Sequence, residues 1–172
     1  YVRGEDGTEV TLTILSNQKT SDVTVTRGAL DTSAFYEIRK QGNVSFGYIE
    51  LSTFGTDTAK QVEIALEMFK KKNIQTLVID LRDNGGGLVA EALKIVDYIV
   101  PKDQTALITV DKDGKEEISK TKEDAIITEP IVLLVNSSSA SASEIMAGAL
   151  KDLKCATIVG TKTYGKGVIQ QL

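Results

Sequence analysis

The sequence contains no histidine among its 172 residues. Within this chain, that absence rules out a Ser-His-Asp triad, a Cys-His dyad and a metal centre with histidine ligands. Acid–base catalysis near neutral pH would have to use a carboxylate, a lysine, a tyrosine or a cysteine. The composition therefore leaves few ways to build a hydrolytic site.

Cysteine and long apolar runs are also scarce. The single cysteine, Cys155, fits a small core residue and cannot form a disulfide within the chain, which suits intracellular and secreted proteins equally. No apolar run approaches the roughly 20 residues that a membrane span needs. The chain opens without Met or a signal peptide, so we expect it to be part of a longer protein.

Neither sign of charge dominates the sequence. The net charge of −4 arises from 20 basic and 24 acidic residues scattered along the chain. This balance gives no basic surface for nucleic acid or an anionic membrane.

The chain begins with a short β pattern. Polar and apolar residues alternate over residues 9–26, and residues 17–21 supply a turn, so we expect a hairpin there. A hairpin alone is too small for a stable domain. We therefore divide the chain at residue 30.

The remainder alternates strands and helices, which predicts an α/β domain with βαβ units and a mostly parallel sheet. Thr58 and Gln61 have the spacing of a capping box at the start of a helix. The other elements expected are strands at 44–51, 75–81, 131–135 and 156–159, helices at 58–71, 88–100 and 144–150, and a hairpin over 106–119 with an Asp-Gly turn.

A serine-rich tract, residues 136–144, lies between a buried strand and a helix. A plain reading makes it a loop in which one serine caps the helix. In the functional reading, Ser141 is a nucleophile at a strand-to-helix turn, and the N–H of Ala142 donates into an oxyanion hole. Glu144 fits a first-turn helix charge better than a catalytic acid.

The run Gly85-Gly86-Gly87 also follows a buried strand and opens a helix. Glycines allow positive φ and a close approach of the backbone to a ligand. A phosphate cradle is one alternative, but the spacing of the known phosphate loops is absent. Two interpretations of the glycine run stay open: a backbone donor to an oxyanion, and a simple tight turn. The nearby Asp80 and Arg82 fit either an ordinary ion pair or a bridge to neighbouring loops that holds the glycine loop open.

Lys166 lies between two glycines and precedes an apolar stretch. Most lysines are solvated surface residues, and the reference pKa of about 10.4 leaves roughly one in 10³ neutral at pH 7. A lysine that acts as a base is expected to be buried away from water. If residues 166–170 form a strand, Lys166 and Gln170 share a face, and Gln170 can orient the amine.

Three segments together resemble a known family. VIDLRDNGGG, VNSSSASASEIMAGAL and GTKTYGKGVIQ, in this order, closely resemble the carboxy-terminal processing (tail-specific) proteases, the S41 peptidase family. The likeness covers about residues 38–172. Three linked motifs in order are far more specific than any one of them.

The resemblance implies a serine endopeptidase with a crotonase/ClpP-like core at residues 31–172, truncated at its C-terminal end. By motif, Ser141 is the nucleophile, Lys166 its general base, and Gln170 positions the lysine. The oxyanion hole uses backbone amides of Ala142 and the glycine run. Gly87 is the first choice there and Gly86 the second. The mechanism implied is a Ser–Lys dyad acting through an acyl-enzyme, with no metal and no cofactor.

The resemblance also concerns partners and location. Residues 1–30 look like the closing hairpin and linker of a largely absent PDZ domain, a module that captures C-terminal peptides by strand addition. The substrates implied are C-terminal tails of proteins. The location implied is extracytoplasmic: periplasm, cell envelope or secreted. Membrane association would come only from regions outside this chain, and homo-oligomer formation stays open.

Two other functions share these features. One is a non-catalytic relative of the same fold that binds a lipophilic ligand or a peptide. The other is a crotonase-like acyl-CoA enzyme, which shares the oxyanion architecture. Neither needs the set Ser141, Lys166 and Gln170, and no adenine-binding feature is recognisable.

Overall fold

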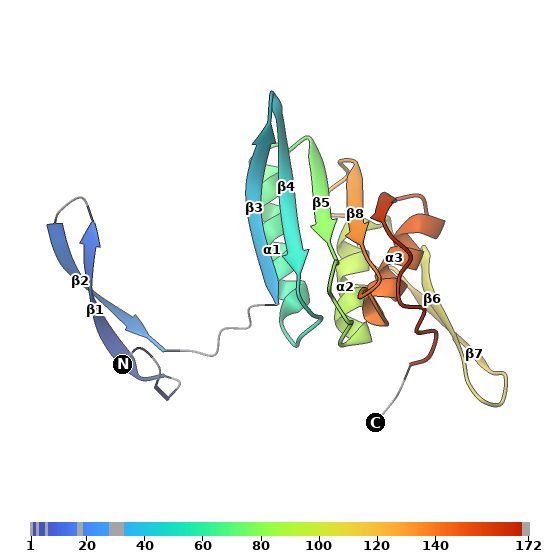
Figure 1. Cartoon of the computed structure of the whole chain (residues 1–172). Coiled ribbons are helices and arrows are strands. Elements are labelled where there is room, and N and C mark those ends of the chain that lie inside the picture. Colours follow the sequence, from blue (N-terminus) through green and yellow to red (C-terminus); the bar gives the residue numbers. More distant parts are fainter. Residues whose placement is uncertain (1, 3, 6, 17–18, 28–32, 170–172) are drawn as a thin grey trace. The chain divides into compact units, whose positions relative to one another are not determined.

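A computed structural model describes residues 2, 4–5, 7–16, 19–27 and 33–169 (Figure 1). The chain divides into two compact units, Tyr1–Leu30 and Asp31–Leu172. None of the described helices is long and apolar enough to cross a membrane.

The first unit is the predicted hairpin. Strands β1 (Glu9–Ser16) and β2 (Lys19–Thr26) pair antiparallel, with Glu9 opposite Thr26 and Ser16 opposite Lys19. The turn was predicted too long, because ladder pairing already includes residues 19–21. Its assignment to a PDZ domain stays a prediction.

The second unit is built on a five-stranded sheet with the order β3-β4-β5-β8-β9. Its strands are β3 (Ala34–Gln41), β4 (Val44–Leu51), β5 (Thr76–Asp80), β8 (Ile131–Val135) and β9 (Ala156–Gly160). Strand β3 pairs antiparallel with β4, and all other pairs are parallel. The mostly parallel sheet is thus confirmed, whereas β3 was not anticipated from the sequence.

Three helices pack against the sheet: α1 (Thr58–Lys71), α2 (Val89–Ile99) and α3 (Ala142–Asp152). Helices α1 and α2 lie behind the sheet in Figure 1, and α3 contacts α2 and β9. Alternate strand residues face these helices and are almost wholly buried, as period-2 side-chain geometry requires. The fully buried strand residues on this side include Ile49, Leu51, Leu77, Ile79 and Leu133.

The capping box predicted at the start of α1 is wrong. The Gln61 side chain accepts a hydrogen bond from Ala34 N–H at 3.2 Å, so it ties the helix to β3. The Thr58 hydroxyl accepts from Gly55 N–H at 2.8 Å and also bonds the Ser33 hydroxyl at 2.6 Å. Contacts with Ser33 and with the first residue of β3 replace the local capping box.

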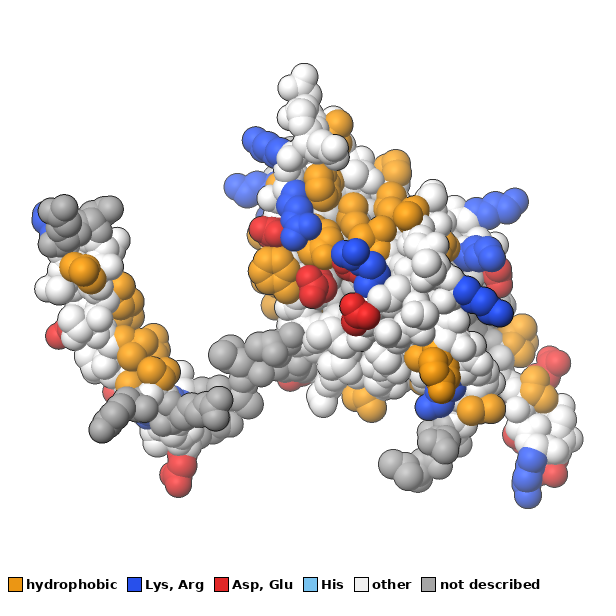
Figure 2. Space-filling view, viewed as in Figure 1, with side chains coloured by type: hydrophobic (Ala, Val, Ile, Leu, Met, Phe, Trp, Pro, Cys, Tyr) orange, Lys and Arg blue, Asp and Glu red, His pale blue; other side chains and the backbone are white. Residues whose placement is uncertain are grey.

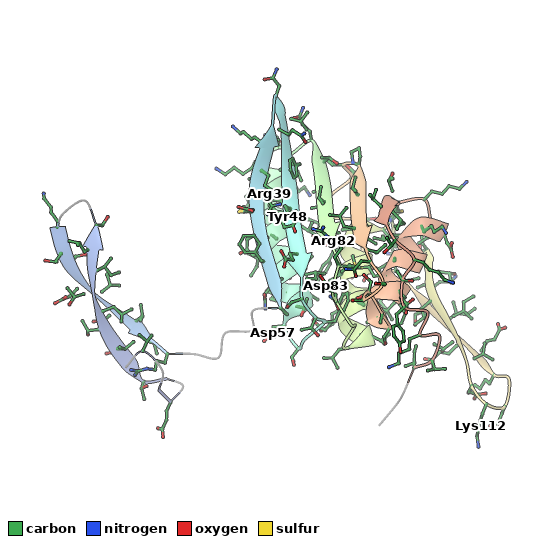
Figure 3. All side chains as sticks on the ribbon, in the orientation of Figure 1. Arg39, Tyr48, Asp57, Arg82, Asp83 and Lys112 are labelled. Carbon is green, nitrogen blue, oxygen red and sulfur yellow. The ribbon has the colours of Figure 1, made fainter. Side chains whose placement is uncertain are left out.

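The predicted second hairpin is confirmed as β6 (Thr105–Val110) and β7 (Glu116–Lys120). Asp111 Oδ1 accepts hydrogen bonds from the N–H groups of Asp113 and Lys115, each at 2.9 Å, and so organises the turn. Lys112 is labelled at this turn in Figure 3. Ile108, Val110 and Ile118 on the hairpin are all more than half exposed.

The sheet face opposite the helices carries both apolar and charged side chains (Figure 2). Here the Arg39 guanidinium stacks 3.6 Å from the centre of the Tyr48 ring, and Tyr48 donates its hydroxyl to Asp80 at 2.8 Å (Figure 3). Burial, followed by the bond to Asp80, raises the pKa of Tyr48 to about 12. This cluster contacts the end of β5, just before the loop that carries the glycine run.

Candidate active site

The two loops that carry the serine tract and the glycine run follow neighbouring strands. Strands β5 and β8 pair in parallel, so their carboxyl ends lie at one edge of the sheet. In open α/β sheets, this edge is where ligands bind. The topology therefore brings together two segments that lie about 50 residues apart in sequence.

Hydrogen bonds join the two loops directly. The backbone oxygen of Asn84 accepts from Ala140 N–H at 3.1 Å and from the Ser143 hydroxyl at 2.9 Å. Asn136 accepts from Asp83 N–H at 3.0 Å and donates to the Asp83 carboxylate at 2.9 Å. The loops therefore form one rigid assembly.

Ser141 is the residue that precedes the first turn of α3, and its backbone is unusual. Its φ of 57° and ψ of −116° lie outside the regions that non-glycine residues favour. Such strain persists where the surroundings impose it, and it is typical of nucleophiles on a strand-to-helix turn. The serine is half-buried and lines a cleft.

The glycine loop packs tightly against this turn. Gly86 has a φ of +106°, and a Cβ there would lie 2.8 Å from Ala140 O and 2.9 Å from the Ser141 Cβ. Gly87 has a φ of +141°, and a Cβ there would lie 2.4 Å from Phe54 O. Only glycine fits at either position.

The amides of this loop are not equivalent. Gly86 donates its N–H to the Asn84 side chain at 2.8 Å, so this N–H is already engaged. Within the described part of the chain, no hydrogen bond uses the N–H of Gly87 or of Ala142. The geometry therefore favours Gly87 over Gly86 as the partner of Ala142, and Gly86 instead shapes the loop.

Lys166 lies on an irregular segment, residues 161–169, that follows β9. Tyr164 in this segment donates its N–H to Ser139 O at 3.0 Å, which anchors the segment to the serine tract. The expected apolar strand is not observed: none of residues 161–169 is in a strand, although Thr161 donates its N–H to Val135 O at the end of β8 at 3.3 Å. Gln170 lies outside the described residues.

The burial expected for Lys166 is wrong for the described part of the chain, where this residue is exposed. The backbone hydrogen bond from Tyr164 to Ser139 holds the segment of Lys166 on the molecular surface. Even so, Ser141 and Lys166 line the same cleft, of about 820 Å³. The other lining residues come from the β6–β7 hairpin, α3 and the segment itself: Leu107, Ile108, Thr109, Val110, Asp111, Lys115, Glu117, Glu144, Ile145, Gly167, Val168 and Ile169.

Glu144 has a role that the sequence did not reveal. Its Oε2 accepts from Ser141 N–H and from Lys166 N–H, each at 2.9 Å, and its Oε1 accepts from Gly165 N–H at 2.7 Å. A glutamate three residues after a helix-capping serine is a recognisable signal for a capping box. Nothing local could have shown that the same carboxylate also holds a segment more than 20 residues later.

These contacts determine the ionisation of Glu144. Partial burial raises its pKa, but hydrogen bonds from the Thr163 side chain and from the N–H groups of Gly165, Lys166 and Ser141 outweigh it, so the pKa lies below the usual 4.5. The stability that these bonds contribute is present above the unfolded pKa, about 4.3, and is lost as pH falls through the lowered native value. The carboxylate therefore stays ionised at neutral and mildly acidic pH.

Arg82 does not bridge to a neighbouring loop in the described structure. It pairs with Asp80 through Nε at 2.9 Å and a terminal nitrogen at 2.6 Å. Of the two alternatives left open by the sequence, the ordinary ion pair is the one observed. Arg82 and Asp83 are both labelled near the end of β5 in Figure 3.

Among the described residues, no group of three or more Cys, Asp or Glu side chains is arranged to hold a metal ion. The half-buried Cys155 lies just before β9 and donates to Leu153 O at 3.5 Å, and burial raises the pKa of its thiol.

Comparison with known proteins points to one family. The sequence pattern of peptidase family S41 matches residues 45–172. The chain is 36% identical, over 98% of its length, to a probable CtpA-like serine protease of Staphylococcus haemolyticus (strain JCSC1435). It is 39% identical, over 99% of its length, to a carboxyl-terminal-processing protease of Synechocystis sp. (strain ATCC 27184 / PCC 6803 / Kazusa). It spans only 34% and 41% of those two proteins.

Solved structures agree with this family. The photosystem II D1 C-terminal processing protease matches 98% of this chain and 47% of its own, with a TM-score of 0.74 and 30% identity. A putative S41 protease from Bacteroides fragilis NCTC 9343 matches 92% of this chain and 48% of its own, with a TM-score of 0.67. At 18% identity, the second likeness supports the fold alone.

Proposed function

The chain belongs to peptidase family S41, and on that premise we propose that it is the core of a serine endopeptidase that cuts proteins at or near their C-termini. The nucleophile is Ser141 and the general base is Lys166. One observation carries the proposal: the strained serine and the lysine line one cleft. The proposed core is crotonase/ClpP-like.

The reaction is acyl transfer. Neutral Lys166 takes the proton from the Ser141 hydroxyl, whose oxygen attacks the scissile carbonyl carbon. The N–H groups of Gly87 and Ala142 stabilise the resulting oxyanion. Lys166 then protonates the leaving amine as the C–N bond breaks, and water hydrolyses the acyl-enzyme. No cofactor enters these steps.

A solvated lysine carries an ammonium group, which has no lone pair to accept a proton, so the proposal requires the Lys166 amine to be desolvated and neutral before it reacts. The cleft that Lys166 lines is also lined by the apolar residues Ile145, Val168 and Ile169. A peptide bound in this cleft would displace water from around the amine and favour its neutral form. Gln170 is proposed to orient the neutral amine.

The proposed partners are C-terminal tails of protein substrates, delivered by the PDZ domain that residues 1–30 would complete. The proposed location is extracytoplasmic. Both proposals rest on the resemblance to the family.

The exposure of Lys166 favours a second candidate, a non-catalytic relative that binds a peptide in the same cleft. Such a protein would keep the cleft but would not need a neutral lysine. The two candidates differ in one measurable property, which is turnover.

Mass spectrometry of a peptide incubated with the intact protein tests the proposal. We expect cleavage near a free C-terminus, and slower cleavage of the same peptide with an amidated C-terminus. A Ser141→Ala variant provides the control for contaminating proteases. Binding without cleavage would support the second candidate, and cleavage that persists in the variant would reject Ser141 as nucleophile.

A further inference from the structure

One carboxylate oxygen connects the two proposed catalytic residues. Glu144 Oε2 accepts hydrogen bonds from the N–H groups of Ser141 and Lys166, each at 2.9 Å. The two backbone nitrogens therefore lie no further apart than twice that distance. No other described side chain bonds the backbone of both residues.

The second oxygen strengthens the same connection. Glu144 Oε1 accepts from Gly165 N–H at 2.7 Å, so two successive amides of the lysine segment bind one carboxylate. Segment 161–169 has no ladder pairing in the described structure, and the one other backbone bond at its centre joins Tyr164 to Ser139. Glu144 thus makes most of the contacts that fix residues 164–166. Charge-assisted bonds of this kind are stronger than neutral ones.

A second glutamate in the chain has the same local position but different contacts. Glu91 is the third residue of α2, as Glu144 is the third residue of α3. Its carboxylate accepts from Ala59 N–H at 2.9 Å and pairs with Lys94 at 2.7 Å. Glu91 therefore ties α2 to α1, and among the described residues its carboxylate bonds only Ala59 and Lys94, which makes it a matched control.

We infer that Glu144 is a positioning residue for the proposed Ser–Lys dyad, because its carboxylate sets the lysine segment against the nucleophile turn. This inference rests on the proposed function. Catalysis is sensitive to placement, and a displacement of about 1 Å can cost roughly 10²-fold in rate. Glu144 itself transfers no proton in this account.

The test compares Glu144→Gln with Glu91→Gln in the intact protein. Glutamine keeps the size of the side chain but has one acceptor oxygen and a donor amide, so it cannot accept all of the N–H groups that Glu144 binds. We expect Glu144→Gln to lower kcat by about 10- to 100-fold with little change in KM. We expect Glu91→Gln to leave kcat within about twofold and to lower the melting temperature.

Amide hydrogen exchange gives a readout that does not depend on activity. We expect faster exchange in Glu144→Gln confined to residues 163–167 and the Ser141 turn, with the sheet unaffected. Unchanged exchange there, or faster exchange with unchanged kcat, would overturn the inference. So would faster exchange across the whole sheet in both variants, since Glu144 would then serve only overall stability.

Failure of the proposed function would look different. If the parent protein shows no Ser141-dependent cleavage, then the catalytic role fails and Glu144 positions no dyad. The exchange data would still report whether its contacts hold the segment.

Discussion

Replacing either Ser141 or Lys166 with alanine is expected to lower kcat by about 10⁴-fold or more while leaving the fold intact. The size follows from the way in which nucleophile and base act as a unit, so that loss of one member costs nearly as much as loss of both. Neither side chain belongs to the buried core, so melting temperatures should change little. Peptide cleavage rates and thermal unfolding of the intact protein measure the two effects.

Matched controls are available a few residues from each site. Ser138 is an exposed serine of the same tract, and Lys162 is an exposed lysine of the same segment. Ser138→Ala and Lys162→Ala should both retain the parental rate. Turnover within about tenfold of the parent in Ser141→Ala or Lys166→Ala would reject the assignment of that residue.

Gly86→Ala is expected to lower kcat by about 10²- to 10³-fold, the cost of losing an oxyanion donor. The added Cβ would lie 2.8 Å from Ala140 O and 3.1 Å from Ala142 N, at a φ of +106°. Backbone atoms cannot move aside as a flexible side chain can. The loop must shift, and the neighbouring Gly87 N–H shifts with it.

Gly85→Ala is the matched control, because a Cβ at Gly85 meets nothing within 4 Å. Steady-state kinetics on both variants would show a large loss for Gly86→Ala and almost none for Gly85→Ala. Equal losses would mean that the glycine run acts through general loop flexibility. No loss in either would place the oxyanion hole elsewhere.

Much of the fold could be predicted because its signals are local. Apolar runs gave the parallel strands, and helical periodicity gave α1 and α2 to within one residue at each end. Strand β3 was missed because it is a half-exposed edge strand with charged residues at Glu37, Arg39 and Lys40. Its pairing with β4 is a tertiary preference that no local pattern records.

The candidate site was only partly predicted, because its motifs are local whereas several of its contacts are tertiary. The motifs pointed to Ser141 and Lys166, and the structure brings both to one cleft. It could not be predicted that Gly86 N–H is occupied by Asn84, because that bond depends on the path of the loop. Likewise, the Thr58–Gln61 pattern suggested a capping box, yet Gln61 bonds β3.

The contacts of Glu144 illustrate the limit most clearly. Its bond to Ser141 is local, so a capping-box pattern predicts it. Its bonds to Gly165 and Lys166 join segments separated by β9, and only the three-dimensional structure reveals them. The residue that links the two halves of the proposed dyad was therefore classed as an ordinary helix charge.

The central claim is that Ser141 is a nucleophile activated by Lys166, and covalent labelling tests it most directly. The intact protein would be treated with a fluorophosphonate, and the modified residue mapped by tandem mass spectrometry. The account predicts modification at Ser141 in the parent protein, and labelling at least about 100-fold slower in Lys166→Ala. Labelling of another serine with Ser141 unmodified, or equal rates in the two proteins, would contradict it.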